Sequence, residues 1–168
     1  RRTLAEVRGA FGTRLSAISI GSAPVTPEVF GFLKRCFSDI WVSEGYGSTE
    51  VGTIATDGKI AAQAQVKLVP LPESSDPNRG EVWVKSPHAI EGYLGDADAT
   101  AKAFDAEGYF ATGDLGERDA EGRVRVVGRL RNTVKLAQGE FVSAERIEAV
   151  LGSAPGVPTN YGGLTIVP

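Results

Sequence analysis

The sequence contains no methionine, one cysteine and one histidine among its 168 residues. Cys36 alone excludes a disulfide bond within the chain, which is typical of a reducing compartment, and we expect the cytoplasm. His88 has no cysteine or second histidine with which to share a metal, which excludes a zinc site of that type. Because even an initiating methionine is missing, we expect this chain to be a piece of a longer protein.

Long apolar runs and excess positive charge are also scarce. No apolar run is long enough to span a bilayer, and the start of the chain has no signal-peptide pattern. The formal net charge is −3 at pH 7, from 18 basic and 21 acidic residues, which argues against a surface dedicated to nucleic acid. The length fits one ordinary domain.

The first third of the chain follows a helix–strand pattern. A capping box at Thr3 and Glu6 predicts a short helix there. Runs rich in β-branched residues predict strands at 15–20 and 40–43, separated by a helix that begins after Thr26. Strand, helix and strand in this order predict a parallel pair, whose loops meet at the edge where such sheets bind ligands.

From residue 59 onward the pattern changes to the alternation typical of half-buried antiparallel strands. Beyond residue 132 a short strand, a turn at 138–140 and a helix capped by Ser143 are expected. The predicted fold class is therefore α/β, in four parts: a parallel α/β part over 1–58, a small β-barrel or curved sheet over 59–128, a break in the pattern at 129–132, and a strand–helix unit over 133–168 with a truncated or disordered end.

A Gly-rich decamer, 43–52, follows the second strand. Its glycines let the backbone approach a flat ligand, and a tyrosine between them offers a ring face for stacking on an aromatic base. Hydroxyls beside a carboxylate suit a phosphate with its magnesium. A simple turn with a solvated carboxylate fits the decamer equally well. The residues concerned are Gly45, Tyr46, Gly47, Ser48, Thr49 and Glu50.

Five short motifs follow one another along the chain: Gly-Ser-Ala-Pro at 21–24, Gly-Tyr-Gly-Ser-Thr-Glu at 45–50, Gly-Glu-Val-Trp-Val at 80–84, Tyr-Phe-Ala-Thr-Gly-Asp at 109–114 and Gly-Arg-Leu-Arg at 128–131. In this order they resemble the adenylate-forming ligases, which include acyl-CoA synthetases, luciferases, peptide-synthetase adenylation domains and the adenylation domain of carboxylic acid reductases. The stretch 135–142 is most similar to long-chain acyl-CoA synthetases and carboxylic acid reductases.

The resemblance implies ATP and Mg²⁺ as cofactors, with CoA or a phosphopantetheine thiol as acceptor. Tyr46 is implied to stack on adenine, and Asp114 to accept hydrogen bonds from the two ribose hydroxyls. Thr49 is implied to contact phosphate, Glu50 to hold magnesium, and Arg129 to reach the ribose or phosphate region. The remaining residues implied to line the nucleotide pocket are Gly21, Ser22, Ala23, Gly45, Gly47 and Ser48.

By the same resemblance Lys135 approaches the pantetheine arm of the acceptor and counts as catalytic together with Thr49 and Glu50. The resemblance also implies that 1–58 is the end of the α/β subdomain, that 129–132 is a hinge, and that 133–168 begins a small α+β C-terminal domain. Arg131 is implied to be the hinge residue, where relatives often have Asp or Lys. Plain structural interpretations stay open for single residues: Asp114 as a turn residue, and Arg129 and Lys135 as solvated charges. The family's phosphate-binding loop and its C-terminal lysine are not found in the sequence, and we expect them outside it.

The implied function is ATP-dependent activation of a carboxylic acid, fatty or other acyl, to an acyl-adenylate, followed by thioester formation with CoA. One alternative is an adenylation domain that loads an acyl or peptidyl carrier domain. A regulatory pseudo-ligase keeps the fold without the activity. A different class is a non-enzymatic β-rich binding module whose motif matches arise by chance. The expected partners are a small-molecule carboxylic acid and, in the first alternative, the carrier domain, but not nucleic acid.

Overall fold

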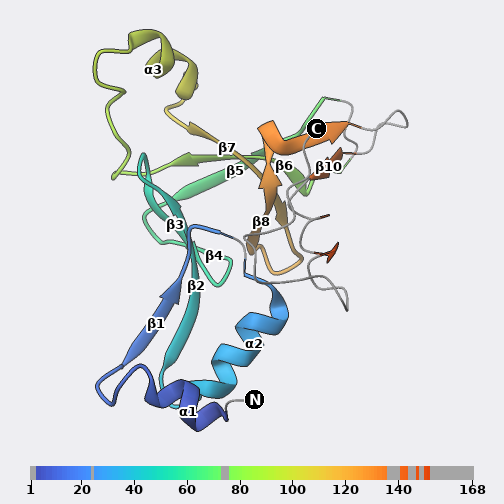
Figure 1. The fold of residues 1–168 in the computed structure, drawn as a ribbon. Helices are drawn as coiled ribbons and strands as arrows, with labels where there is room; N and C mark the ends of the chain where they lie inside the picture. Colours follow the sequence, from blue (N-terminus) through green and yellow to red (C-terminus); the bar gives the residue numbers. More distant parts are fainter. Residues whose placement is uncertain are drawn as a thin grey trace.

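A computed structural model of the protein describes residues 3–23, 25–72, 76–135, 141–143, 147, 150 and 151. The helices are α1 (Leu4–Gly9), α2 (Pro27–Cys36), α3 (Ala97–Ala103) and the 3₁₀ turn η1 (Leu130–Asn132). The strands are β1 (Ala17–Ile20), β2 (Trp41–Ser48), β3 (Gly52–Thr56), β4 (Lys59–Ile60), β5 (Gln65–Val69), β6 (Arg79–Lys85), β7 (Phe110–Arg118), β8 (Val124–Arg129), β9 (Thr133–Lys135) and β10 (Phe141–Ser143). This mixture of elements confirms the predicted α/β class (Figure 1).

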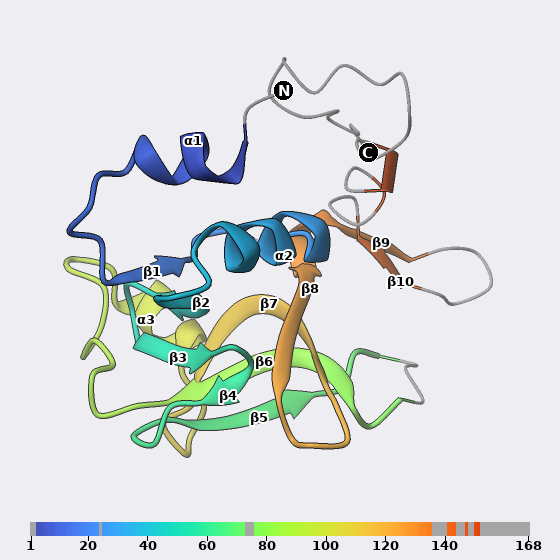
Figure 2. The ribbon, with the colours of Figure 1, turned by 90° about the horizontal axis from the view of Figure 1, so that it is seen from below.

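Helices α1 and α2 begin where the sequence predicts. The capping box is present, because Thr3 Oγ1 accepts from Glu6 N at 3.3 Å and Glu6 Oε2 accepts from Thr3 N at 2.7 Å. Thr26 Oγ1 caps α2 by accepting from Val29 N at 3.4 Å. Figure 2 shows α2 lying along β1 and β2. A small apolar core joins α2 to the sheet that contains β1 and β2. The buried members of this core are Cys36, Phe37 and Val42.

Strands β1 and β2 are parallel, as predicted, with Ala17 opposite Trp41. The prediction that the second strand ends at 43 is wrong, because β2 continues to residue 48 and pairs antiparallel with β3. Glycine permits this pairing: a Cβ on Gly47 would lie 2.5 Å from the carbonyl oxygen of Gly52. The Gly-rich decamer therefore forms the end of β2, the turn of the hairpin and the first residue of β3.

The β-rich part of the chain forms an antiparallel four-stranded sheet in the order β5-β6-β7-β8. Side chains on one face of this sheet pack against the β2–β3 hairpin and form the larger of the two apolar cores. Figure 2 shows the hairpin beside β6 and β7. The buried members of this core are Val51 and Ile54 of the hairpin, Ala64, Val82 and Val84 of β6, Phe110 of β7 and Val124 of β8. This shared core holds the end of β2 next to β7.

The turn η1 leads from β8 into β9, which pairs antiparallel with β10. The short strand predicted after residue 132 is thereby confirmed, whereas the turn expected at 138–140 lies outside the described residues. Of the helix expected after Ser143, the structure describes Ile147, Val150 and Leu151 as helical. In the part of the chain that is described, no helix is long and apolar enough to cross a membrane.

Candidate functional site

Three side chains from three strands meet where the β2–β3 hairpin adjoins the β5-β6-β7-β8 sheet. The hydroxyl of Tyr46 on β2 donates to Asp114 Oδ2 on β7 at 2.8 Å. The guanidinium Nε of Arg129 on β8 lies 2.9 Å from Asp114 Oδ1. Asp114 and Arg129 are direct partners in the β7–β8 register, so the ion pair spans neighbouring strands. Each carboxylate oxygen of Asp114 thus has one protein partner and keeps further acceptor capacity for a ligand.

Asp114 is buried although it carries a charge, with 5 % of its surface exposed. Burial raises the pKa of the Asp114 carboxyl above its ordinary value, while the hydrogen bond from Tyr46 and the charge of Arg129 oppose this rise. Burial and the nearby Asp114 carboxylate likewise raise the pKa of the Tyr46 hydroxyl. Tyr46 therefore stays protonated and serves as a hydrogen-bond donor.

Glu50 lies in the turn between β2 and β3, at the rim of the same site. Its Oε1 accepts from the hydroxyl of Tyr93 at 3.2 Å, and its backbone oxygen accepts from Ile90 N at 2.7 Å. Partial burial by itself raises the pKa of Glu50, but hydrogen bonds from its own backbone and from Tyr93, with the charge of Arg129, bring it below the ordinary value. Glu50 is therefore an ionised carboxylate facing the site.

Glu50 can bind a hard divalent cation only together with ligands that come from outside the protein. Among the residues that the structure describes, no three His, Cys, Asp or Glu side chains gather to hold a metal. Mg²⁺ characteristically takes one or two carboxylates and fills its octahedron with phosphate oxygens and water. Glu50, which is half-buried and follows the exposed Thr49 in the turn, matches that need when a phosphorylated ligand is present.

The loop after β1 approaches the hairpin from the other side. A Cβ on Gly21 would lie 2.9 Å from the carbonyl oxygen of Gly45, so the two backbones are in close contact. Ser22 adopts a positive φ of 72°, and Val25 N donates to Glu44 Oε1 at 3.4 Å. The exposed residues 21–23 therefore border β2 at Gly45, just past the point where its pairing with β1 ends.

The predicted site residues fall into two groups. Gly21, Ser22, Ala23, Gly45, Tyr46, Gly47, Ser48, Thr49, Glu50, Asp114 and Arg129 lie on the edges and strand ends just described. Arg131 is exposed in η1. Lys135 belongs to β9 and pairs with Phe141, but its side chain lies outside what the structure describes.

The sequence did not point to two residues that contact the site. Tyr93 donates to Glu50, and the hydroxyl of Thr112 lies 3.4 Å from that of Tyr46 while donating to the carbonyl of Val82 at 2.7 Å. Thr112 belongs to a motif that the resemblance had marked, so its position could have been inferred. Tyr93 lies in an irregular segment, where no periodic pattern indicates the direction of a side chain.

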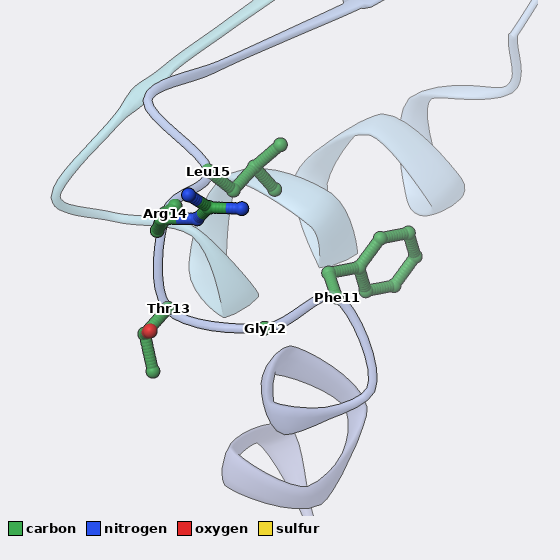
Figure 3. A pocket seen from close by; sticks show the side chains of 5 residues that line it. All are labelled: Phe11, Gly12, Thr13, Arg14 and Leu15. Atoms are coloured by element: carbon green, nitrogen blue, oxygen red, sulfur yellow. The ribbon is translucent and has the colours of Figure 1, made fainter.

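A cavity of about 540 Å³ lies at the opposite end of β1, before the strand begins. Figure 3 shows its lining side chains pointing apart from one another around the loop. The lining residues are Phe11, Gly12, Thr13, Arg14 and Leu15. None of them carries a carboxylate or lies at the carboxyl edge of the sheet, and this cavity is separate from the candidate site.

No family model matches the sequence. Comparison with individual known proteins nevertheless finds relatives that agree with one another in kind. The chain is 36 % identical over 160 residues to a carboxylic acid reductase of Mycobacterium tuberculosis, covering 90 % of this chain and 14 % of the relative. It is 35 % identical over 162 residues to the long-chain acyl-CoA synthetase 6, peroxisomal, of Arabidopsis thaliana, covering 86 % of this chain and 23 % of the relative. The chain thus spans less than a quarter of these relatives.

A solved structure shows the same arrangement of elements. The A domain of the carboxylic acid reductase from Segniliparus rugosus, in complex with AMP and a co-purified carboxylic acid, superposes with a TM-score of 0.76 at 32 % identity. The match covers 90 % of this chain and 25 % of that domain. The similarity in sequence and the similarity in structure therefore point to the same kind of protein.

The burial of Asp114 predicts an unusual pH dependence of stability. Because its pKa is raised in the folded state, ionised Asp114 lowers the free energy of unfolding above that pKa, and this cost disappears as the pH falls below the ordinary value. Asp114→Asn keeps the shape without the charge. We expect the variant to melt at a higher temperature than wild type at about pH 7, with a difference that shrinks toward about pH 3.

Asp119→Asn is a control of opposite sign. Asp119 is exposed. Desolvation by itself would raise its pKa, but the hydrogen bonds from the side chain and backbone of Arg123, with the charge of Arg123, together lower it, so the charge of Asp119 stabilises the folded state at neutral pH. Melting curves across this pH range should show Asp119→Asn at or below wild type. A lower melting temperature for Asp114→Asn at neutral pH would mean that the ion pair with Arg129 outweighs burial.

Proposed function

Since this chain belongs to the superfamily of adenylate-forming ligases, we propose that it forms the nucleotide-binding part of an enzyme that activates a carboxylic acid with ATP. The observation that carries the proposal is the meeting of Tyr46, Asp114 and Arg129 beside Glu50. A buried carboxylate with free acceptor capacity suits two neighbouring hydroxyls, such as those of a ribose. If the motif matches had arisen by chance in a non-enzymatic binding module, these residues would not be expected to lie together.

The nucleotide lies, in this proposal, along the edge formed by the loop 21–23 and the end of β2. The ring of Tyr46 stacks on the adenine base, and the glycines around it allow close backbone approach. Asp114 accepts both ribose hydroxyls, while Tyr46 and Arg129 hold its carboxylate in place. In this proposal the hydroxyl of Thr49 and the carboxylate of Glu50 face the phosphates, while the buried hydroxyl of Ser48 lies behind Glu50.

The reaction proceeds in two steps. An oxygen of the substrate carboxylate attacks the α-phosphorus of ATP, the bond to the bridging oxygen breaks, and pyrophosphate leaves. The sulfur of the acceptor thiol, which gives up its proton to solvent, then attacks the acyl carbon, and AMP leaves with the electrons of the broken carbon–oxygen bond. Glu50 would hold magnesium beside the phosphates, where the metal would neutralise charge. The residues of this chain bind and orient the nucleotide for in-line attack.

We propose CoA as the thiol that receives the acyl group, and a long-chain or other fatty acid as the substrate. The similarity to a long-chain acyl-CoA synthetase supports this choice. The comparable similarity to carboxylic acid reductases favours one second candidate, the phosphopantetheine arm of a carrier domain. In either case Lys135 on β9 is proposed to approach the pantetheine arm. The cytoplasmic location stays a prediction, since one relative is named as peroxisomal.

Glu50→Gln tests the metal site. The substitution keeps the volume of the side chain but removes the ionised oxygen that magnesium requires. In the complete protein we expect carboxylate-dependent ATP–pyrophosphate exchange to fall at least about 100-fold, because several kilocalories of charge stabilisation are lost. Glu91→Gln, an exposed residue on the same segment as Tyr93, is the matched control and should keep full exchange. Near-normal exchange in Glu50→Gln would remove Glu50 from the mechanism.

Arg131 is proposed as the hinge between the β-rich part and the unit that begins with β9. It is exposed in η1, a single turn closed by the bond from Thr133 Oγ1 to the Arg129 carbonyl at 2.7 Å. A short turn between two groups of strands is a place where a rotation between the two half-reactions could be absorbed. Arg131→Pro fixes one dihedral angle and restricts the residue before it.

We expect Arg131→Pro to slow thioester formation about tenfold more than adenylate formation, because only the second step requires the rotation. Pyrophosphate release measures the first step, and transfer of preformed acyl-adenylate to the thiol measures the second. Arg131→Ala removes the charge while leaving the backbone free, and it should affect both steps equally or not at all. Equal slowing of both steps by the proline variant would contradict the hinge.

A further inference from the structure

The pairing of β6 with β7 is interrupted at Asp114 and the two residues before it. Trp83 is opposite Ala111, and Glu81 is opposite Leu115. Val82 alone therefore faces the three residues of β7 at positions 112–114. Such a bulge changes the direction of the strand and turns the side chains it carries, and bulges are common beside active sites. The side chain that this bulge presents to the site is Asp114.

Side chains of β6 and β7, rather than regular strand pairing, hold the bulge in shape. Gly113 adopts a φ of 70°, and its N–H donates to Glu81 Oε1 at 3.2 Å. The other oxygen of Glu81 accepts from the indole N–H of Trp83 at 2.8 Å. On the far side of Gly113, Thr112 Oγ1 accepts from Asp114 N at 3.1 Å and donates to the carbonyl of Val82.

We propose that Glu81 is a positioning residue for Asp114, an inference that rests on the proposed function of Asp114 in binding ribose. Among the described residues, Glu81 makes its side-chain hydrogen bonds with Gly113 and Trp83 and not with Tyr46 or Arg129, so it acts through the backbone of Gly113. The two groups that form hydrogen bonds with Glu81, the N–H of Gly113 and the indole N–H of Trp83, are both donors. Only a carboxylate offers each of them its own oxygen as an acceptor. The charged acceptor fixes the turn that directs Asp114 toward the hydroxyl of Tyr46 and the guanidinium of Arg129.

The nature of the contact makes glutamine the most informative substitution. Glu81→Gln has the same length and shape, but its amide NH₂ would meet one of the two donors and leave it without an acceptor. The bulge then loses one of its fixed points while the apolar core beneath it stays intact. Glu117→Gln is the matched control, because it removes an equal charge from β7 three positions beyond Asp114 and outside the bulge.

The experiment compares the binding of AMP and 2′-deoxyAMP to the complete protein by calorimetry. A hydrogen bond between Asp114 and the 2′-hydroxyl predicts that wild type binds AMP about tenfold more tightly or better. Asp114→Asn should bring this ratio of dissociation constants close to one. Glu81→Gln should lower it at least about threefold, and the double variant should match Asp114→Asn, because both residues act on one interaction.

Each of the remaining outcomes would overturn either the inference about Glu81 or the proposed role of Asp114. A wild-type ratio in Glu81→Gln, together with a lower melting temperature, would mean that Glu81 only stabilises the sheet. A loss of discrimination in Glu117→Gln as well would mean a general effect of charge, and this too would overturn the inference. No discrimination in wild type would overturn the proposed role of Asp114 and the inference with it. If Glu81→Gln fails to fold, Gly113→Ala, strained at its positive φ with open space around it, should lower the ratio instead.

Discussion

The apolar core shared by the β2–β3 hairpin and the second sheet is the constraint on which the site depends. Val51 and Ile54 of the hairpin are fully buried against Val82 and Val84 of β6. Each such side chain contributes about 1.5–3 kcal/mol when it is removed from water. This packing fixes the end of β2 against β7, and it thereby brings Tyr46 within 2.8 Å of Asp114, 68 positions later in the chain.

The same packing explains why a charged group is stable inside the protein. Asp114 is buried, and its carboxylate is compensated by a hydroxyl from the first sheet and a guanidinium from the second. Either partner alone would leave one oxygen without a donor, which is unfavourable in a buried position. Burial still raises the pKa of the Asp114 carboxyl, and its two oxygens keep acceptor capacity for the hydroxyl groups of a ligand.

The sequence allowed the elements and the family to be predicted better than the contacts within the site. The caps at Thr3 and Thr26 are local signals, and both helices begin as expected. The end of β2 was predicted too early, because glycines usually indicate a turn, whereas here Gly47 lets two strands approach closely. The roles of Glu81 and Tyr93 depend on partners more than 30 positions away, and no local pattern indicates such contacts.

The central claim is that the nucleotide binds where β2, β7 and β8 meet. Hydrogen–deuterium exchange of the complete protein, with and without ATP and Mg²⁺, tests this claim most directly. The account predicts that ATP slows exchange in peptides that cover residues 21–23, β2, residues 112–114 and the end of β8, and leaves the cavity loop 11–15 unchanged. Protection confined to that loop, or no protection at the junction of the three strands, would contradict it.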